Sequence, residues 1–223
     1  FVRYVFHGFS CEFIYQYLKQ ADERIQHKKI IIAHLGSGSS ITAIKDGHSV
    51  ENTMGFTPAG GMIMNTRAGD MDPGVLSFLL EQKHMNAAQL QDLFNKQSGL
   101  KAIAGASYTM EELLEKEDKD PKAKEAVLLY CYHAKKHIGA LAAILGGFDI
   151  LVFTGGIGEH SSITRKRICD GLEFAGIEIN EELNDRSAEL ISELPSRVQV
   201  YVIPTNEELV IAGYVKEYVR KHR

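Results

Sequence analysis

Three short runs of strand-forming residues, separated by turns that contain glycine, constrain the fold of this 223-residue chain more than any other feature. The first run, 28–35, stops at a Gly/Ser segment, 36–40, and the second, 41–45, stops at Asp46-Gly47. Residues 48–53 can supply a third strand. Because glycine-containing turns of this length join adjacent antiparallel strands, the sequence predicts an antiparallel meander.

Helical patterns fill the middle of the chain. Asp72-Pro73 is typical of a helix start, with an aspartate that caps the helix and a proline at its first position. Shorter helical patterns follow at 87–95 and 110–116, and the longest pattern, with apolar residues at three- and four-residue steps, covers 121–146. We expect residues from about 73 to 116 to be a helical insertion in a single domain that spans the chain.

The last third of the chain alternates between strand and helix patterns. The predicted elements are a strand at 150–153, helices at 161–175 and 180–190, a strand at 198–203 and a C-terminal helix opened by Thr205. Thr205 and Glu208 have the spacing of a capping box. Because helical crossovers join the later strands, these strands are expected to be parallel, so the fold class is α/β with a mixed sheet.

Composition excludes several classes of protein. Lys and Arg number 25 against 29 Asp and Glu, and this formal charge of −4 gives no bias toward nucleic acid or an anionic membrane. The cysteines at positions 11, 131 and 169 form no CxxC pair, which argues against a disulfide framework or zinc cluster and favours a cytoplasmic compartment. The longest apolar stretch, 138–153, contains glycines and Asp149 and is shorter than the ~20 residues that span a bilayer.

Glycine segments follow two of the predicted strands, at 36–38 and 155–158. Because glycine has no Cβ, its backbone N–H group can approach a phosphate, so two such segments at strand ends indicate a nucleotide cleft. Each segment alone is equally consistent with a tight turn. The second also imitates a dinucleotide fingerprint, with Ser161 at the third glycine position and Glu178 about twenty residues on, which leaves an oxidoreductase as a further alternative.

Arg67 lies in a glycine-rich loop between Thr66 and Gly69, with Asp70 close by. A guanidinium there can grip a phosphoryl group through two parallel hydrogen bonds, or it can pair with the neighbouring carboxylate. His7 lies beside Phe6, a setting in which a lone histidine is more often structural than catalytic. Residue types and spacing alone therefore leave both roles open.

His133 and His137 have the spacing of two metal ligands on one helix face. Lys135 and Lys136 stand between them, and no glutamate follows His133. We interpret this part of the helix as a solvated face.

Glu207 follows the last predicted strand and, unlike Glu208, has no capping role. A free carboxylate at such a strand end can hold a Mg²⁺ ion that keeps most of its waters. It can equally be a favourable charge at the start of a helix.

Six short motifs cover nearly the whole chain. They are Phe6-His7-Gly8, His34-Leu35-Gly36-Ser37-Gly38, Met54-Gly55-Phe56-Thr57-Pro58, Thr66-Arg67-Ala68-Gly69-Asp70-Met71-Asp72-Pro73, Phe153-Thr154-Gly155-Gly156-Ile157-Gly158-Glu159 and Pro204-Thr205-Asn206-Glu207-Glu208-Leu209. Together and in this order they resemble the C-terminal portion of the acetate and propionate kinase family. This ordered set is far more specific than any single glycine segment.

The resemblance implies the fold of the acetate and sugar kinase, Hsc70 and actin type, whose RNase H-like core starts with three antiparallel strands. Family members transfer the γ-phosphoryl group of ATP reversibly to acetate or propionate, with Mg²⁺, and form ADP and an acyl phosphate. The implied partners are therefore a nucleotide, a small carboxylate and, through this domain, a second copy in a homodimer.

Carried over motif by motif, the resemblance also implies site residues. His7 and Arg67 would stabilise the phosphoryl group in flight, Glu207 would hold Mg²⁺, and Phe6 and Pro58 would lie near the apolar end of the carboxylate substrate. The residues expected to line the nucleotide are His34, Leu35, Gly36, Ser37, Gly38, Gly156, Ile157, Gly158, Glu159 and His160.

The sequence departs from the family pattern at several positions. Ser37 and His160 each replace a common asparagine, and Cys11 replaces a histidine found in many members. Thr109-Met110-Glu111 stands where the family has Asp-Met-Arg, so Glu111 reverses a charge near the nucleotide. We expect this reversal to change nucleotide affinity or identity.

The family's N-terminal lobe, with its own phosphate loop, substrate arginine and catalytic aspartate, has no counterpart in this sequence. We therefore expect a separated fragment, or a half-site that a second polypeptide completes, and expect the chain alone to be inactive. The alternative function is a non-catalytic nucleotide-binding or assembly module derived from an acetate kinase.

Overall fold

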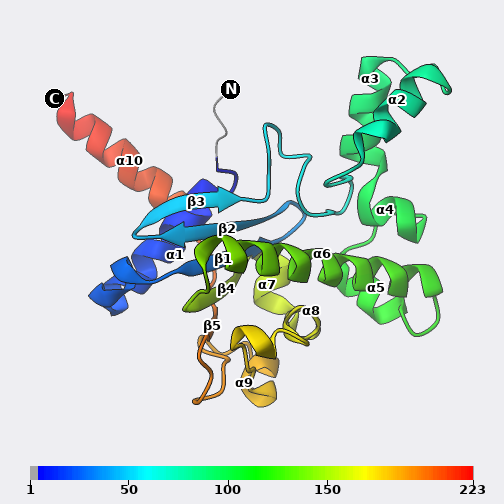
Figure 1. Cartoon of the computed structure of the whole chain (residues 1–223). Coiled ribbons are helices and arrows are strands. Elements are labelled where there is room, and N and C mark those ends of the chain that lie inside the picture. The colour runs from blue at the N-terminus through cyan, green and yellow to red at the C-terminus, as the bar shows by residue number, and fades with distance from the viewer. Residues whose placement is uncertain (1–4, 223) are drawn as a thin grey trace.

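A five-stranded mixed sheet with helices on both faces forms the centre of the computed structural model, which describes residues 5–222 (Figure 1). The strands are β1 (Ile30–Leu35), β2 (Ser39–Lys45), β3 (His48–Asn52), β4 (Ile150–Thr154) and β5 (Gln199–Val202). Their order is β3-β2-β1-β4-β5, with antiparallel pairing from β3 to β1 and parallel pairing from β1 to β5. The mixed sheet and its opening antiparallel meander are therefore confirmed.

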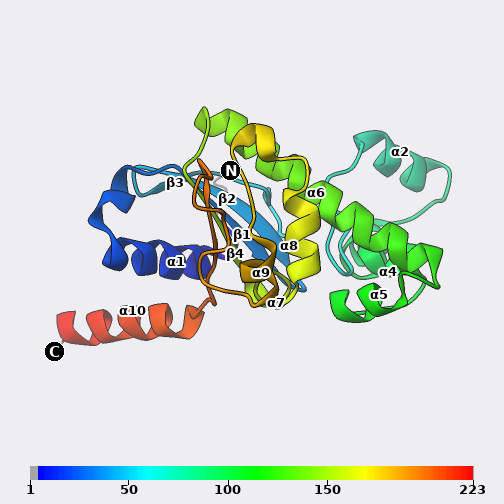
Figure 2. The same cartoon turned by 90° about the horizontal axis from the view of Figure 1, so that it is seen from below.

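Helices cover the two faces of this sheet unequally. They are α1 (Gly8–Ala21), α2 (Pro73–Glu81), α3 (Ala87–Asp92), α4 (Gly99–Ala104), α5 (Met110–Lys116), α6 (Pro121–Leu145), α7 (Gly155–His160), α8 (Ser162–Cys169), α9 (Glu181–Asp185) and α10 (Glu207–Lys221). The shorter helical segments are η1 (Glu23–His27), η2 (Leu93–Gln97) and η3 (Glu173–Ala175). Figure 2 shows α1 on one face of the sheet and α6 with α8 on the other, while α2 projects away from it.

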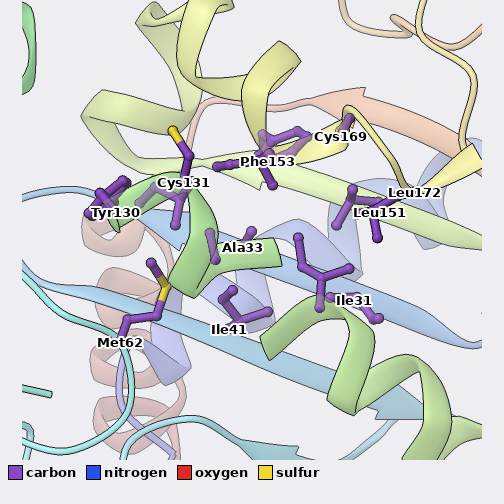
Figure 3. Close-up of a cluster of buried hydrophobic side chains, with 14 of the residues drawn as sticks. Ile31, Ala33, Ile41, Met62, Tyr130, Cys131, Leu151, Phe153, Cys169 and Leu172 are labelled. Atoms are coloured by element: carbon purple, nitrogen blue, oxygen red, sulfur yellow. The ribbon is translucent and has the colours of Figure 1, made fainter. Parts of the chain in front are cut away.

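The core lies on both faces of β1, the central strand. Side chains alternate along a strand, so Ile31, Ala33 and Leu35 point into the larger hydrophobic cluster, which also contains buried side chains of α6 and α8 (Figure 3). Ile30 and Ile32 point into the smaller cluster beneath α1. Because both of its faces are covered, β1 reads as a continuous apolar run in the sequence.

Several predicted helix boundaries are confirmed by their capping groups. The Asp72 carboxylate accepts a hydrogen bond from Gly74 N at 2.7 Å, and α2 starts at Pro73 as predicted. The long helix α6 ends at Leu145, where Gly146 takes a left-handed conformation with φ of 63°. Residues 110–116 form α5 as expected.

Three local predictions are wrong. The helix expected at 161–175 stops at Cys169, because Gly171 has a left-handed backbone with φ of 82°. The helix expected at 180–190 is limited to α9. Asn206, not Thr205, caps α10: its side-chain oxygen accepts from Leu209 N at 3.0 Å, so the predicted capping box is absent.

Two further features are the state of the cysteines and the character of the helices. Cys11, Cys131 and Cys169 are buried free thiols, and burial raises the pKa of Cys11 and of Cys131 to about 11. Within residues 5–222, no helix has both the length and the apolar character needed to cross a bilayer.

Candidate active site

The two glycine segments meet at one edge of the sheet. β1 and β4 are parallel neighbours, with His34 opposite Thr154, and both strands end there. Gly155 has a left-handed φ of 77°, and a Cβ on it would lie 2.7 Å from the Leu35 carbonyl oxygen. A Cβ on Gly36 would lie 4.0 Å from Gly156 N. The backbones of the two segments are therefore side by side, as the strand order predicts.

The first segment is the tight turn between β1 and β2. Gly36 N donates to Gly38 O at 3.2 Å, and Ser39 Oγ donates back to Gly36 O at 3.1 Å. The Ser39 hydroxyl also hydrogen-bonds the buried Tyr130 hydroxyl at 2.8 Å, and burial raises the pKa of that phenol. A residue of α6 thus holds the turn from the far side of the larger core.

The second segment is the first turn of a helix, not a loop as expected. The six-residue helix α7 starts at Gly155 directly after β4. Glu159 folds back along it, so that its carboxylate accepts from Gly155 N at 2.8 Å and from Thr205 N at 3.2 Å. This carboxylate joins α7 to the segment between β5 and α10.

A pocket of about 780 Å³ opens beside the two segments. Its other walls come from several helices and the segments beside them. They include Leu100 of α4, Met110 and Leu114 of α5, Tyr130 of α6 and Ile163 of α8. Five of the ten residues expected to line a nucleotide contribute to this pocket, namely Gly36, Ser37, Gly156, Ile157 and His160.

The other five of these ten residues do not line the pocket. Leu35 is fully buried in the larger cluster, and a Cβ on Gly158 would lie 3.4 Å from the Phe153 carbonyl carbon. The Glu159 carboxylate is held by the backbone contacts described above. His34 and Gly38 are near neighbours of His7.

His7 and His34 form a stacked pair, with ring centroids 3.9 Å apart and an angle of 12° between the planes. His7 caps α1 from a left-handed conformation, and its Nδ1 hydrogen-bonds Ser40 Oγ at 2.8 Å. His34 Nδ1 hydrogen-bonds Ser10 Oγ at 2.8 Å. Hydroxyl groups of β2 and α1 therefore fix the orientation of both rings.

Both imidazoles are neutral near pH 7. Burial, reinforced by the Arg67 charge, lowers the pKa of His7 to about 4, and burial with His7 alongside lowers the pKa of His34 to about 3. Ser40 donates its hydroxyl proton to Phe6 O at 3.2 Å, so it must accept from His7 Nδ1–H. His7 Nε2 is then an unprotonated nitrogen.

Arg67 reaches the same point as His7 from a different part of the chain. A Cβ on Gly38 would lie 3.5 Å from both His7 Nε2 and Arg67 Nη1. Nη1 donates to the Pro58 carbonyl at 3.3 Å, and no carboxylate of the described residues pairs with this guanidinium. Asp70 instead accepts from Gly61 N at 2.7 Å. Pairing of Arg67 with a neighbouring carboxylate, the alternative left open by the sequence, is therefore wrong.

Phe6 and Pro58 are linked to this point through their backbone carbonyl groups. Both are half-buried, and their carbonyl oxygens accept from Ser40 Oγ and Arg67 Nη1 respectively. Each residue therefore adjoins one of the two side chains that converge on Gly38.

Glu207, the first residue of α10, is half-buried and lies close enough to Cys11 of α1 for its charge to raise the pKa of that thiol. Its carboxylate has no hydrogen-bond or ion-pair partner in the described part of the chain. Residues 5–222 hold no cluster of three or more His, Cys, Asp or Glu side chains suited to a metal. A single free carboxylate fits Mg²⁺, which is usually bound by one or two carboxylates together with substrate phosphates.

Comparison with known proteins decides the family. Residues 1–213 match the acetokinase family. This chain belongs to that family. It is 42% identical to the acetate kinase of Clostridium acetobutylicum over 225 residues, an alignment that covers 98% of this chain. It is 47% identical to the acetate kinase of Nitrobacter hamburgensis over 212 residues, which cover 95% of this chain.

Solved structures agree with the acetokinase assignment. The acetate kinase of Porphyromonas gingivalis superposes with a TM-score of 0.92 at 40% identity, over 97% of this chain and 56% of that one. The propionate kinase of Francisella tularensis gives 0.88 at 34% identity, over 94% and 54%. The fold is therefore the acetate and sugar kinase, Hsc70 and actin type, as expected.

The chain spans about half the length of the acetokinase relatives that it matches, since it covers 56% of the Clostridium acetobutylicum protein and 52% of the Nitrobacter hamburgensis protein.

The departures from the acetokinase pattern lie at identifiable places. Glu111 is exposed on α5 and lines the pocket, together with Glu115 one turn later. Thr109 caps α5, where its hydroxyl accepts from Glu112 N at 3.2 Å. Glu111 thus stands at the pocket in the position of the arginine that the resemblance implies, and Glu115 adds a second carboxylate to the lining.

Sequence reasoning missed several residues that shape this site. Gly99 starts α4 with φ of 69°, and a Cβ there would lie 2.2 Å from Met64 O and 2.9 Å from Arg67 N, so glycine lets α4 pack against the Arg67 loop. Asn65 lines the pocket, and its buried Oδ1 has no partner. The dipeptide Ser98-Gly99 is a local sequence signal for the role of Gly99. No local pattern in the sequence indicates the role of Asn65.

His133 and His137 are half-buried, so the prediction of a solvated face is wrong for them. His133 Nδ1 accepts from Ile63 N at 3.4 Å, and burial lowers the pKa of both rings. Both rings face residues 61–63, which lead to the Arg67 loop, because this part of α6 packs against that segment.

Proposed function

We propose that this chain is the nucleotide-binding half of a kinase that transfers the γ-phosphoryl group of ATP to acetate or propionate and forms an acyl phosphate. The convergence of His7 Nε2 and Arg67 Nη1 on Gly38, beside the pocket, carries this proposal. The names of the relatives, acetate and propionate kinases, support the reaction class. We further propose that α2 to α5 are an insertion in this single domain.

Arg67 and His7 would act on the transferring phosphoryl group. A loose phosphoryl transition state needs positioning and positive charge more than covalent chemistry. Arg67 supplies a guanidinium that pairs with no carboxylate within residues 5–222. His7 Nε2 has a lone pair in the unliganded state, so His7 would take up a proton as the phosphoryl anion approaches and would then donate to it.

Glu207 would hold Mg²⁺, with phosphate oxygens and waters completing the coordination. Bound there, the ion would neutralise the charge that develops on the phosphates. The Glu207 carboxylate, which no other described residue engages, suits this role.

The carboxylate end of the site is less complete. Phe6 and Pro58 would contact the small apolar group of the substrate from one side. The other walls, and a catalytic group for the acceptor, would come from the half of the relatives that this chain does not match, and a homodimer would form through the present half.

Calorimetric titration of MgATP into the chain tests the nucleotide half. Saturable binding is expected, with at least tenfold weaker affinity for MgATP in Glu207→Ala and unchanged affinity for ATP in EDTA. Arg67→Ala is expected to bind MgATP within about threefold of the parent, because its role belongs to the transition state. Absence of any heat in the parent chain would contradict the proposal.

A non-catalytic nucleotide-binding module is the second candidate, and the two carboxylates of α5 at the pocket favour it. Acetyl phosphate formation, trapped as the hydroxamate, separates the two when the N-terminal half of the Clostridium acetobutylicum enzyme is added. Turnover that is lost in Arg67→Ala supports the kinase. MgATP binding without turnover under every condition supports the module.

A further inference from the structure

Arg165 is an arginine with no contact to solvent. It lies in α8, its exposed fraction is 0%, and it is the largest of the fully buried side chains. Burial lowers the pKa of its guanidinium to about 10. A buried charge is costly unless its hydrogen-bonding capacity is satisfied, so the partners of this side chain determine what it does.

Neutral oxygen atoms satisfy the whole guanidinium. Nη1 donates to the carbonyls of Gly158 at 2.8 Å and Glu159 at 3.0 Å. Nε donates to Asn184 Oδ1 at 2.8 Å, and Nη2 donates to Asn184 O at 2.7 Å and Ser187 Oγ at 3.0 Å. These five contacts match the five N–H donors of arginine, and none of them is to a carboxylate.

The acceptors belong to α7, to α9 and, at Ser187, to the segment that follows α9. Gly158 and Glu159 are in the last turn of α7, where carbonyl groups have no partner further along the same helix. Asn184 is in α9, is 1% exposed, and donates its own amide to Ser162 O at 3.0 Å. Arg165 therefore ties the end of α7 to α9 across the start of α8.

This contact matters because α7 is short and borders the pocket. A helix of six residues does not hold its shape by its own hydrogen bonds. Glu159 fixes its first turn through Gly155 N, and Arg165 fixes its last turn through two carbonyls. Between these two fixed ends lie Gly156 and Ile157, which line the pocket.

We propose that Arg165 is a positioning residue for nucleotide binding: it holds α7 in place through the Gly158 and Glu159 carbonyls, so that the Gly156 and Ile157 backbone meets the phosphates. Arg165 itself touches no nucleotide. The inference rests on the proposed nucleotide role of the pocket.

Arg165→Lys tests this assignment, because lysine keeps the charge and loses the fork that reaches both elements. Arg167→Lys is the matched control: Arg167 is on the same helix and pairs with Glu117 through contacts of 2.6 and 2.7 Å, away from the pocket. We expect Arg165→Lys to weaken MgATP affinity at least tenfold and adenosine affinity less than threefold. We expect Arg167→Lys to change neither by more than twofold.

Amide hydrogen exchange without nucleotide provides the second measurement. Arg165→Lys should speed exchange at the α7 amides at least tenfold, while β1 and β2 exchange as in the parent. If the parent chain fails to bind MgATP, the proposed function fails, and the exchange pattern then decides only whether Arg165 holds α7 in place.

Three outcomes overturn the assignment. They are α7 exchange within twofold of the parent, equal losses of affinity for MgATP and adenosine, and the same behaviour in Arg167→Lys. Should Arg165→Lys not fold, Ser187→Ala removes a single acceptor and should speed α7 exchange about threefold, and an unchanged rate there counts against the proposal.

Discussion

The two glycine segments lie next to each other at the ends of parallel strands, yet the chain holds them in different ways. The β1–β2 turn is fixed by neutral hydroxyl groups, above all the contact of 2.8 Å between Ser39 and Tyr130. The first and last turns of α7 are fixed by the side chains of Glu159 and Arg165. One strand-then-glycine pattern therefore gives two structures, and the residues that follow the glycines decide which one forms.

The difference also separates two tasks at the site. The turn after β1 adjoins the side chains of His7 and Arg67, which we propose act on the phosphoryl group. The helix after β4 offers the backbone of Gly156 and Ile157 to the pocket. In the proposed function, side-chain chemistry and backbone binding thus fall to neighbouring segments with independent supports.

The largest expected effect comes from breaking the contact between the segments. Gly155→Ala should lower the free energy of unfolding by more than about 3 kcal/mol, because Gly155 has φ of 77° and the new Cβ would lie 2.7 Å from the Leu35 carbonyl. Urea denaturation followed by circular dichroism measures this loss.

Gly156→Ala is the control for this change. A Cβ at Gly156 meets nothing within 4 Å, so the stability should stay within about 1 kcal/mol of the parent. Similar losses in the two variants would show that the segments are not in close backbone contact.

The second largest expected effect is a loss of folding stability in acid. It arises from His7 and His34, which lie at the β1–β2 turn. In the unfolded chain His7 and His34 take up protons near their ordinary pKa of 6.5, whereas in the fold their pKa values are about 4 and 3. Stability is therefore fully present above pH 6.5 and falls as the pH drops toward 4, by about 2 kcal/mol for each ring at pH 5.

His34→Gln checks this sign. Between pH 7 and pH 5 the variant should lose about 2 kcal/mol less than the parent in urea titrations, because one buried ring is gone. His48→Gln, which changes an exposed residue of β3, should leave the parent curve unchanged. A parent curve that is flat over this range would refute the prediction.

The smallest of the three effects concerns the hydroxyl contact itself. Tyr130→Phe removes the partner of Ser39 and should lower the free energy of unfolding by about 1 kcal/mol. Tyr132→Phe, at a side chain that is 62% exposed on the same helix, should stay within about 0.5 kcal/mol. Equal effects would mean that the turn does not depend on α6.

Local patterns predicted much of this fold. Residue types within a few positions of each other predict the strands of the meander, β1 to β3. They also predict the cap at Asp72 and the limits of α5 and α6. Thr205 and Asn206 show where such reasoning fails, because both residue types cap helices and only the chain path selects Asn206.

Only part of the candidate site could be predicted from local patterns. The meeting of the glycine segments follows from strand order. The roles expected of His7 and Arg67 came from a family resemblance, since residue types left both roles open. Ser39 and Tyr130 are 91 positions apart, so no local pattern links them. Arg165 stands in a short polar helix, where an arginine ordinarily lies on the surface.

During synthesis the central strand, β1, leaves the ribosome well before β4, one of the two strands that pair with it. Ile30 of β1 pairs with Ile150 of β4, and at a ribosomal rate of roughly 5–20 residues per second these residues emerge about 6–24 seconds apart. During that interval one edge of β1, a strand in which three of the six residues are isoleucine, is unpaired and prone to aggregate. The speed at which ribosomes translate the intervening helices should therefore influence the yield of folded protein in a cell.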